Sequence, residues 1–257
     1  MGVWAPIASS CIVALALVWQ IAAARADQRD DFLAGRTREC PRCDLAGQSF
    51  KRRDLSNANL AGANLNNANF HDARLIGARL AGADLTSANL NKANLSRADL
   101  REAKLHEAML YAANLDGATM AGADLTDAMM GTARMTRTDL GRATLRNVDL
   151  RKGRLAETNL VGADLSAIAL DFAMLRGAQL DGASLVEARL LGAELTDVSM
   201  KGADLTEVDA QGASFRGADL SRAKLARANF RRATLHETKL DDAVFDRTMM
   251  PDGTTVP

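Results

Sequence analysis

The chain has 257 residues, and its 32 Lys and Arg balance its 32 Asp and Glu, so the formal net charge at pH 7 is zero. A balanced charge gives no electrostatic reason to expect a nucleic-acid partner, and it also argues against a surface that imitates one. Aromatic residues make up only 4% of the sequence, which excludes an aromatic-rich core and leaves aliphatic side chains to build it.

Residues 1–26 have the layout of a secretory signal peptide. An apolar run extends over 11–24, and the Ala-Arg-Ala at 24–26 places small residues before a cleavage point after Ala26. No Lys or Arg precedes the run, although signal peptides usually carry one there. The alternative is an uncleaved membrane anchor, for which the run is short. We expect cleavage, which leaves an exported chain that starts near Asp27.

Residues 27–42 are predicted to form an N-terminal cap. The stretch 27–39 can form a short amphipathic helix with Phe32 and Leu33 on one side and Gly35 near its end. We expect this helix to cover the start of the region that follows.

The cap leads into a cysteine pair, Cys40-Pro-Arg-Cys43, whose spacing occurs in redox-active and metal-binding pairs. Zinc needs about four ligands, and no second pair follows. Because an exported chain meets an oxidising compartment, we expect a structural disulfide. A reduced buried pair and a thiol-exchange site stay open as alternatives.

From residue 43 to residue 250 the chain follows a five-residue rule. Every fifth residue from Leu45 to Met250 is Leu, Phe or Met, except Ala210, and we term these the leucine sites. Two places earlier the residue is usually Ala, and we term these the alanine sites. The residue just before a leucine site is mostly polar, often Asp or Asn, and the two after it are polar or Gly. Such an internal repeat must be explained before any single element.

A period of five fits neither standard element. On a helix, successive leucine sites drift by about 140°, and on a flat strand they alternate between faces. Within one repeat, however, Ala83 and Leu85 point the same way if that piece is extended. Leu90 can also point inward if the chain bends after Leu85, where the small, polar and Gly residues suit a turn. The sequence therefore predicts a coil with one shared apolar interior.

The tandem A(D/N)LXX pattern closely resembles the pentapeptide repeat family, and the resemblance covers residues 43–250. Membership implies an all-β fold, a right-handed four-sided parallel β-helix with four pentapeptides per coil and, here, about ten coils. Each coil would pair its backbone groups with the coils above and below, so that only the end coils lack partners. Leucine sites one coil apart would stack in the interior, and the central ones are Leu85, Leu105, Leu125, Leu145 and Leu165.

Residues 251–257 form a short C-terminal tail with a Pro-Asp-Gly turn and no helix to cover the last coil. The last coil is therefore predicted to be open to another molecule, including a second copy of the chain.

No residue set in the sequence predicts catalysis. His71, His106 and His236 each follow a leucine site, should point to solvent, and fall on three different sides of a four-sided coil. We expect no catalytic residues, no cofactor and no metal site, and therefore a protein that is not an enzyme.

One side of the predicted coil instead collects apolar residues at outward-facing sites. Scattered exposed apolar residues are normal, whereas a contiguous strip would indicate a partner surface. The residues concerned, which we term the apolar strip, are Met109, Tyr111, Met129, Phe172 and Leu191.

The best-known members of this family protect type II topoisomerase by resembling DNA, with a strongly acidic surface. The balanced charge and the expected export both depart from that pattern, so a topoisomerase-binding (gyrase-binding) DNA mimic of the quinolone-resistance type is the alternative function. We expect an exported scaffold in the bacterial periplasm or outside the cell, a rigid rod that binds an unknown protein partner. We expect no nucleic-acid partner and no membrane contact beyond an uncleaved N-terminal segment.

Overall fold

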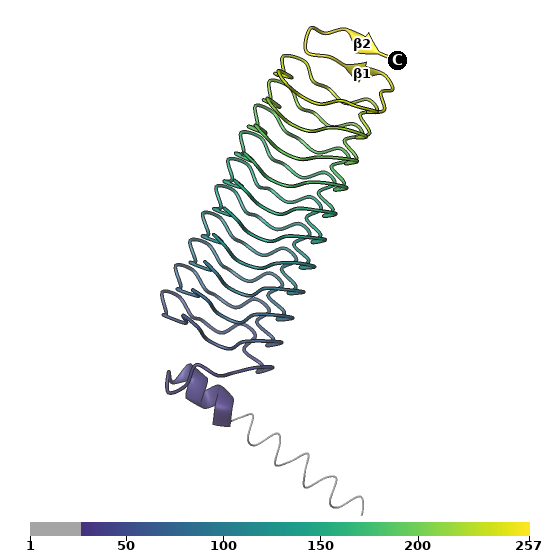
Figure 1. The fold of residues 1–257 in the computed structure, drawn as a ribbon. Helices are drawn as coiled ribbons and strands as arrows, with labels where there is room; N and C mark the ends of the chain where they lie inside the picture. The colour runs from purple at the N-terminus through teal and green to yellow at the C-terminus, as the bar shows by residue number, and fades with distance from the viewer. Residues whose placement is uncertain (1–26) are drawn as a thin grey trace, which may run out of the picture.

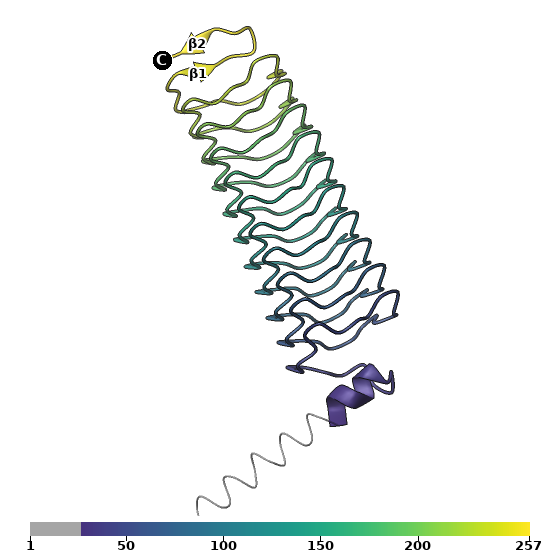
Figure 2. The ribbon, with the colours of Figure 1, turned by 180° about the vertical axis from the view of Figure 1, so that it is seen from behind.

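The computed structural model describes residues 27–257, and the predicted signal peptide lies outside the described residues. A helix over residues 27–33 leads into a long coiled rod, which ends in a hairpin of β1 (Thr248–Met249) and β2 (Thr255–Val256) (Figure 1). The view from behind shows the same unbroken stack of coils (Figure 2). Between residues 27 and 257, no helix combines the length and apolar character needed to cross a membrane.

The rod is a parallel coil with 20 residues per turn. Parallel bridges join residues 20 apart in an unbroken series from residue 39 to residue 249. Each bridging residue occupies the site just before a leucine site, which we term the ladder site. Leucine-site amides donate to the ladder-site carbonyl of the next coil, as Leu85 does to Lys104 at 2.7 Å. The coil predicted from the repeat is confirmed, and so are the parallel pairing and the four pentapeptides per turn that the family resemblance implies.

Each five-residue unit ends in a corner made by the two residues after the leucine site, which we term the first and second corner sites. The second corner site has a positive φ, for example 64° at Gly82 and 54° at Ser87. The turn closes when the alanine-site amide donates to the leucine-site carbonyl, as Ala88 does to Leu85 at 2.9 Å. This is the arrangement of a type II turn, whose third residue needs φ > 0 and favours Gly. At Ser87 the conformation is held because its amide also donates to the next coil.

Asp and Asn at the ladder sites have a structural task. Their side-chain oxygens accept a hydrogen bond from the first-corner amide two residues later, as Asp84 does from Thr86 at 3.0 Å. Within the described residues that amide takes part in no backbone bond, so it would otherwise be unpaired. Where the ladder site holds Arg134, the carboxylate of Asp116 one coil earlier accepts the amide of Thr136 instead, also at 3.0 Å.

The interior of the rod is apolar and filled by the leucine and alanine sites. Phe50 and Phe70 stack with their ring centroids 4.9 Å apart. At the exceptional leucine site Ala210, the neighbouring alanine site holds the larger Val208, and both are buried, so the volume is preserved. The predicted central stack is fully buried, with 0% exposure at each of Leu85, Leu105, Leu125, Leu145 and Leu165.

The helix at residues 27–33 packs on the first coil and is shorter than the stretch 27–39 expected from the sequence. Phe32 is fully buried, and its ring meets that of Phe50 edge to face at 5.8 Å. The Arg53 guanidinium donates to the carbonyls of Phe32 and Leu33, each at 3.1 Å. Gly35 follows with a φ of 76°, a left-handed conformation that ends helices.

The C-terminal end is only partly covered. β1 and β2 pair antiparallel, and the predicted turn closes with a hydrogen bond from Gly253 to Met250 at 2.9 Å. This hairpin extends one side of the last coil (Figure 1). On the other sides Leu235, Leu240 and Phe245 are only partly buried, whereas all leucine-site residues from 45 to 230 are buried. The last coil is therefore open on the sides that the hairpin does not cover.

Candidate functional site

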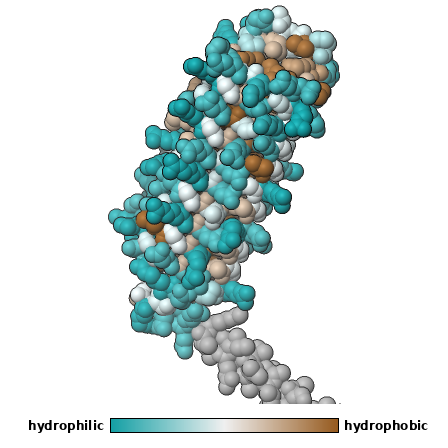
Figure 3. Space-filling model, in the orientation of Figure 1, coloured by the Kyte–Doolittle hydropathy of each residue, from teal (hydrophilic) through white to brown (hydrophobic). Residues whose placement is uncertain are grey.

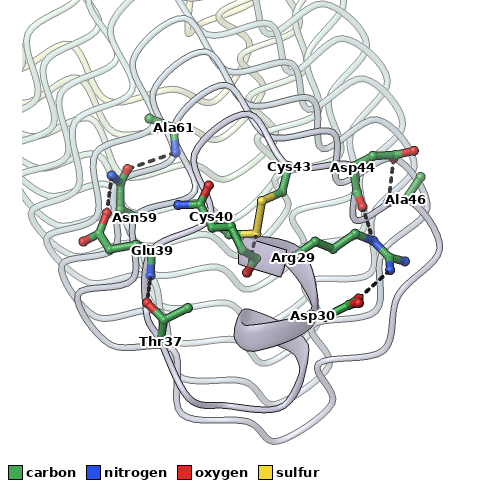
Figure 4. The surroundings of a disulfide bond; sticks show 11 residues. Arg29, Asp30, Thr37, Glu39, Cys40, Cys43, Asp44, Ala46, Asn59 and Ala61 are labelled. Atoms are coloured by element: carbon green, nitrogen blue, oxygen red, sulfur yellow. Dashed lines mark hydrogen bonds and ion pairs between the residues drawn. A yellow bond between two sulfur atoms is a disulfide. The ribbon is translucent and has the colours of Figure 1, made fainter. Parts of the chain in front are cut away.

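The cysteine pair forms a disulfide across a corner of the first coil. The sulfur atoms of Cys40 and Cys43 are bonded, and both side chains are buried. Figure 4 shows the disulfide next to the capping helix, where the Arg29 guanidinium donates to the carbonyl of Asp44 at 2.8 Å. Of the alternatives left open by the sequence, the structure contains the disulfide. Because thiol exchange needs an exposed sulfur, this buried pair fits a staple that fastens the cap.

The histidines lie apart on the rod and do not gather into a site. The His106 side chain is partly exposed, with its Nε2 3.4 Å from Glu107 and its Nδ1 4.0 Å from Asp127. In residues 27–257 no group of three or more His, Cys, Asp or Glu is arranged to hold a metal ion. The candidate site considered below is the apolar strip.

Three residues of the apolar strip come together in a groove. Met109, Tyr111 and Met129 lie on adjacent coils, and the Met109–Met129 pair is joined by a ladder bridge. Tyr111 and Met129 expose half or more of their surface, at 53% and 50%. The groove has a volume of about 530 Å³, and its remaining lining residues are Asn91, Gly131, Thr132, Asp149, Arg151 and Lys152.

The other two residues of the strip form a second patch further along the same corner. Phe172 is 55% exposed, and its amide donates to the carbonyl of Leu191 on the next coil at 2.9 Å. The strip is thus two patches separated by a polar segment. Figure 3 shows brown apolar patches that interrupt a mostly teal face, with a further brown area at the C-terminal end.

Glycines one coil away make room for the two aromatic rings. A Cβ on Gly131 would lie 3.4 Å from Cδ2 of Tyr111, and one on Gly192 would lie 2.9 Å from Cε1 of Phe172. Each ring therefore lies against the corner of the next coil, which fixes its position while its outer face stays exposed. Rigid exposed aromatic rings lose little entropy on binding and are common anchors of interfaces.

Ion pairs neutralise most charges beside the strip. Arg151 donates to both carboxylate oxygens of Asp149, at 2.8 and 2.6 Å, and this hydrogen bonding lowers the pKa of the Asp149 carboxyl. The nearly buried Asp171 pairs with Arg189 at 2.6 Å. At the edges of the groove and of the second patch, Arg151 and Arg189 are therefore each neutralised by an aspartate.

The sequence interpretation missed Met174, which belongs to the second patch. It is 40% exposed and lies two residues after Phe172, at a ladder site. The sequence did carry a signal for this residue. Ladder sites face outward and are mostly polar, so an apolar Met174 at a ladder site departs from the repeat.

The repeats and the coil identify the family. The family model described as pentapeptide repeats matches eight copies, over residues 54–91, 78–117, 105–142, 132–166, 173–212 and 211–247. The chain belongs to the pentapeptide repeat family. Members and structural neighbours of this family are generally non-enzymatic structural proteins.

Solved structures of pentapeptide repeat proteins resemble this one to different extents. HetL from the cyanobacterium Nostoc sp. strain PCC 7120, a protein involved in heterocyst differentiation regulation, is 30% identical with a TM-score of 0.72. The match covers 90% of this chain and 98% of HetL. A pentapeptide repeat protein of the Arabidopsis thaliana thylakoid lumen is 31% identical, covering 35% of this chain and 62% of that one, with a TM-score of 0.34.

The fluoroquinolone resistance protein QnrB1 is 18% identical over 54% of this pentapeptide repeat protein and 84% of its own chain, with a TM-score of 0.30. No curated protein matches the sequence.

Proposed function

We propose that this pentapeptide repeat protein is an exported, non-enzymatic scaffold whose rigid rod binds another protein through the apolar strip. The observation that carries the proposal is the pair of aromatic side chains, Tyr111 and Phe172, held half exposed on one corner of the rod. The hydrogen bonds between coils fix the backbone at both positions. A surface that is already rigid loses little freedom on binding, so more of its contact energy appears as affinity.

Binding is tested by capture of partners with photo-crosslinking from envelope extracts. The double variant Tyr111→Asp with Phe172→Asp places charges on both patches and should abolish the crosslinked species. Val161→Asp is the matched control, because Val161 is 40% exposed at a first corner site of a different corner. Equal crosslinking by both variants would refute binding through the apolar strip.

Export rests on the layout of residues 1–26. The test is fractionation followed by mass determination of the intact protein. A periplasmic or secreted species that begins near Asp27 supports export with cleavage. A species that keeps Met1 in the membrane fraction would indicate the anchor, and one in the cytoplasm would reject export.

The alternative function, a topoisomerase-binding DNA mimic, is disfavoured by the zero net charge. A supercoiling assay with purified gyrase and a quinolone separates the two functions. Protection of gyrase by the purified chain would replace the scaffold function with this one.

A second copy of the chain is the partner that we propose for the open last coil. Among the described residues, the amides of Leu235, Leu240 and Phe245 have no hydrogen-bond partner, although equivalent amides elsewhere donate to the next coil. Their side chains are also partly exposed. Unpaired strand edges with apolar surface favour pairing with another chain. Sedimentation equilibrium should give a dimer that Phe245→Asp dissociates, and a concentration-independent monomer would refute it.

A further inference from the structure

The polar segment between the two apolar patches contains two cations without partners. Lys152 and Arg154 are exposed, and within residues 27–257 no carboxylate oxygen lies within 4.0 Å of either charged group. The neighbouring Arg151 and Arg189 are each satisfied by their own aspartate. The middle of the strip therefore carries two positive charges that no side chain of the rod neutralises.

These two cations lie between the patches along the rod. Lys152 lines the end of the groove one coil beyond Thr132, and it is one coil before Phe172. Arg154 is bridged to Met174 of the second patch. A partner that covers both patches must therefore cross Lys152 and Arg154, and a carboxylate at that point would be attracted to them.

Along the strip, most backbone amides of the rod are already paired. Leucine-site, ladder-site and second-corner amides donate along the axis, alanine-site amides close the corners, and the Tyr111 amide donates to the side chain of Asn91 at 2.9 Å. An extended segment laid on this side would find few partners for its own backbone, whereas a helix satisfies its backbone internally. Side-chain contact along a surface of this kind favours a helix laid in a groove.

The spacing of the strip matches one face of a helix that runs parallel to the rod. Tyr111, Met129, Lys152 and Phe172 lie on four successive coils, at about 0, 5, 10 and 14 Å along the axis. Positions i, i+4, i+7 and i+11 of a helix share a face and lie at about 0, 6, 10 and 16 Å.

Resting on the proposed scaffold function, we infer that the partner presents an amphipathic helix with apolar residues at i, i+4 and i+11 and a carboxylate at i+7. The apolar residues contact the groove and the Phe172 patch, and the carboxylate lies between Lys152 and Arg154. If the helix runs in the opposite direction, the carboxylate moves to i+4 and the pattern is otherwise mirrored.

The test uses the purified full chain and a display library of helical peptides. The peptides have an uncharged Ala- and Gln-rich background, and positions i, i+4, i+7 and i+11 are randomised. We expect enrichment of apolar residues at the outer positions and of Asp or Glu at one inner position. The selected peptides should bind the double variant Tyr111→Asp with Phe172→Asp at least tenfold more weakly, and the Val161→Asp control unchanged.

The decisive arm repeats the selection on the double variant Lys152→Glu with Arg154→Glu, whose positions are exposed on the surface of the rod. The inner preference should change from Asp and Glu to Lys and Arg, because the local charge is reversed. An inner position without charge preference, or one that the variant leaves unchanged, overturns the inference. In that case outer apolar enrichment that depends on Tyr111 and Phe172 still supports the scaffold function. No enrichment at all counts against both.

Discussion

Replacement of a single interior leucine should weaken the rod far more than the same replacement on its surface. Leu125 is fully buried, between Leu105 and Leu145 in the neighbouring coils. Leu125→Ala removes three carbons, each worth about 0.8 kcal/mol of burial, and leaves a cavity as well. The backbone around the cavity is held by ladder bonds, such as that from Leu125 to Thr144 at 2.8 Å, so the site cannot easily collapse. We expect a loss of about 3–5 kcal/mol.

Leu191→Ala is the matched control, because Leu191 is 39% exposed and its replacement leaves no enclosed cavity. We expect it to cost roughly 1 kcal/mol. Urea unfolding followed by circular dichroism measures both losses. Because a solenoid is stabilised mainly between neighbouring repeats, hydrogen exchange should also show that Leu125→Ala loosens the central coils first. Equal losses for the two variants would refute a shared, closely packed interior.

Three further predictions concern acid, reduction and a single glycine. Several ladder-site carboxyls accept hydrogen bonds that lower their pKa values, as Asp99 does from Arg101. The contribution of these hydrogen bonds to stability is therefore present above pH ~4 and lost as pH falls through the folded-state pKa. Acid titration at constant salt should show this loss, and unchanged stability from pH 7 to pH 2 would contradict it. Reduction of the Cys40–Cys43 disulfide should lower the free energy of unfolding by roughly 2 kcal/mol, given its short loop. It should raise the rate of hydrogen exchange in the first coils only. Faster exchange at the C-terminal end would contradict a disulfide whose effect is local. Gly153→Ala should destabilise the rod by about 1–3 kcal/mol in urea unfolding. A Cβ at this position would lie 3.0 Å from the carbonyl oxygen of Leu150, in an interior that is already filled. A neutral or stabilising effect would show that the interior has spare room.

The five-residue period of the sequence is sufficient to predict the coil and its apolar interior. Spacing by five excludes a helix and a flat strand and leaves a coil with a shared interior. The burial of Leu85 and Leu125 therefore follows from the sequence alone. Once 20 residues per coil are assumed, simple counting also places Tyr111 and Met129 beside each other. These features depend only on the regular backbone, and for that reason they were accessible to sequence analysis.

Features that depend on individual side chains were not predictable in the same way. Asp116 accepts the hydrogen bond of the Thr136 amide because the ladder site of that coil holds Arg134, which cannot accept it. This relation joins residues 20 apart. The lack of partners at Lys152 and Arg154 depends on which neighbouring carboxylates are already taken. The hydrogen bonds from Arg53 to the carbonyls of Phe32 and Leu33 likewise join residues about one coil apart, and sequence periodicity does not encode them.

The two ends of the rod differ, and this difference limits how large an assembly can grow. The helix at residues 27–33 seals one terminus by placing Phe32 on the first coil, so that terminus cannot accept the exposed edge of another molecule. In the dimer proposed above, joining would use the one open end of each copy and would therefore stop at two. A polymer would require the helix to be removed, so truncation before Cys40 is the change expected to convert the proposed dimer into a fibre.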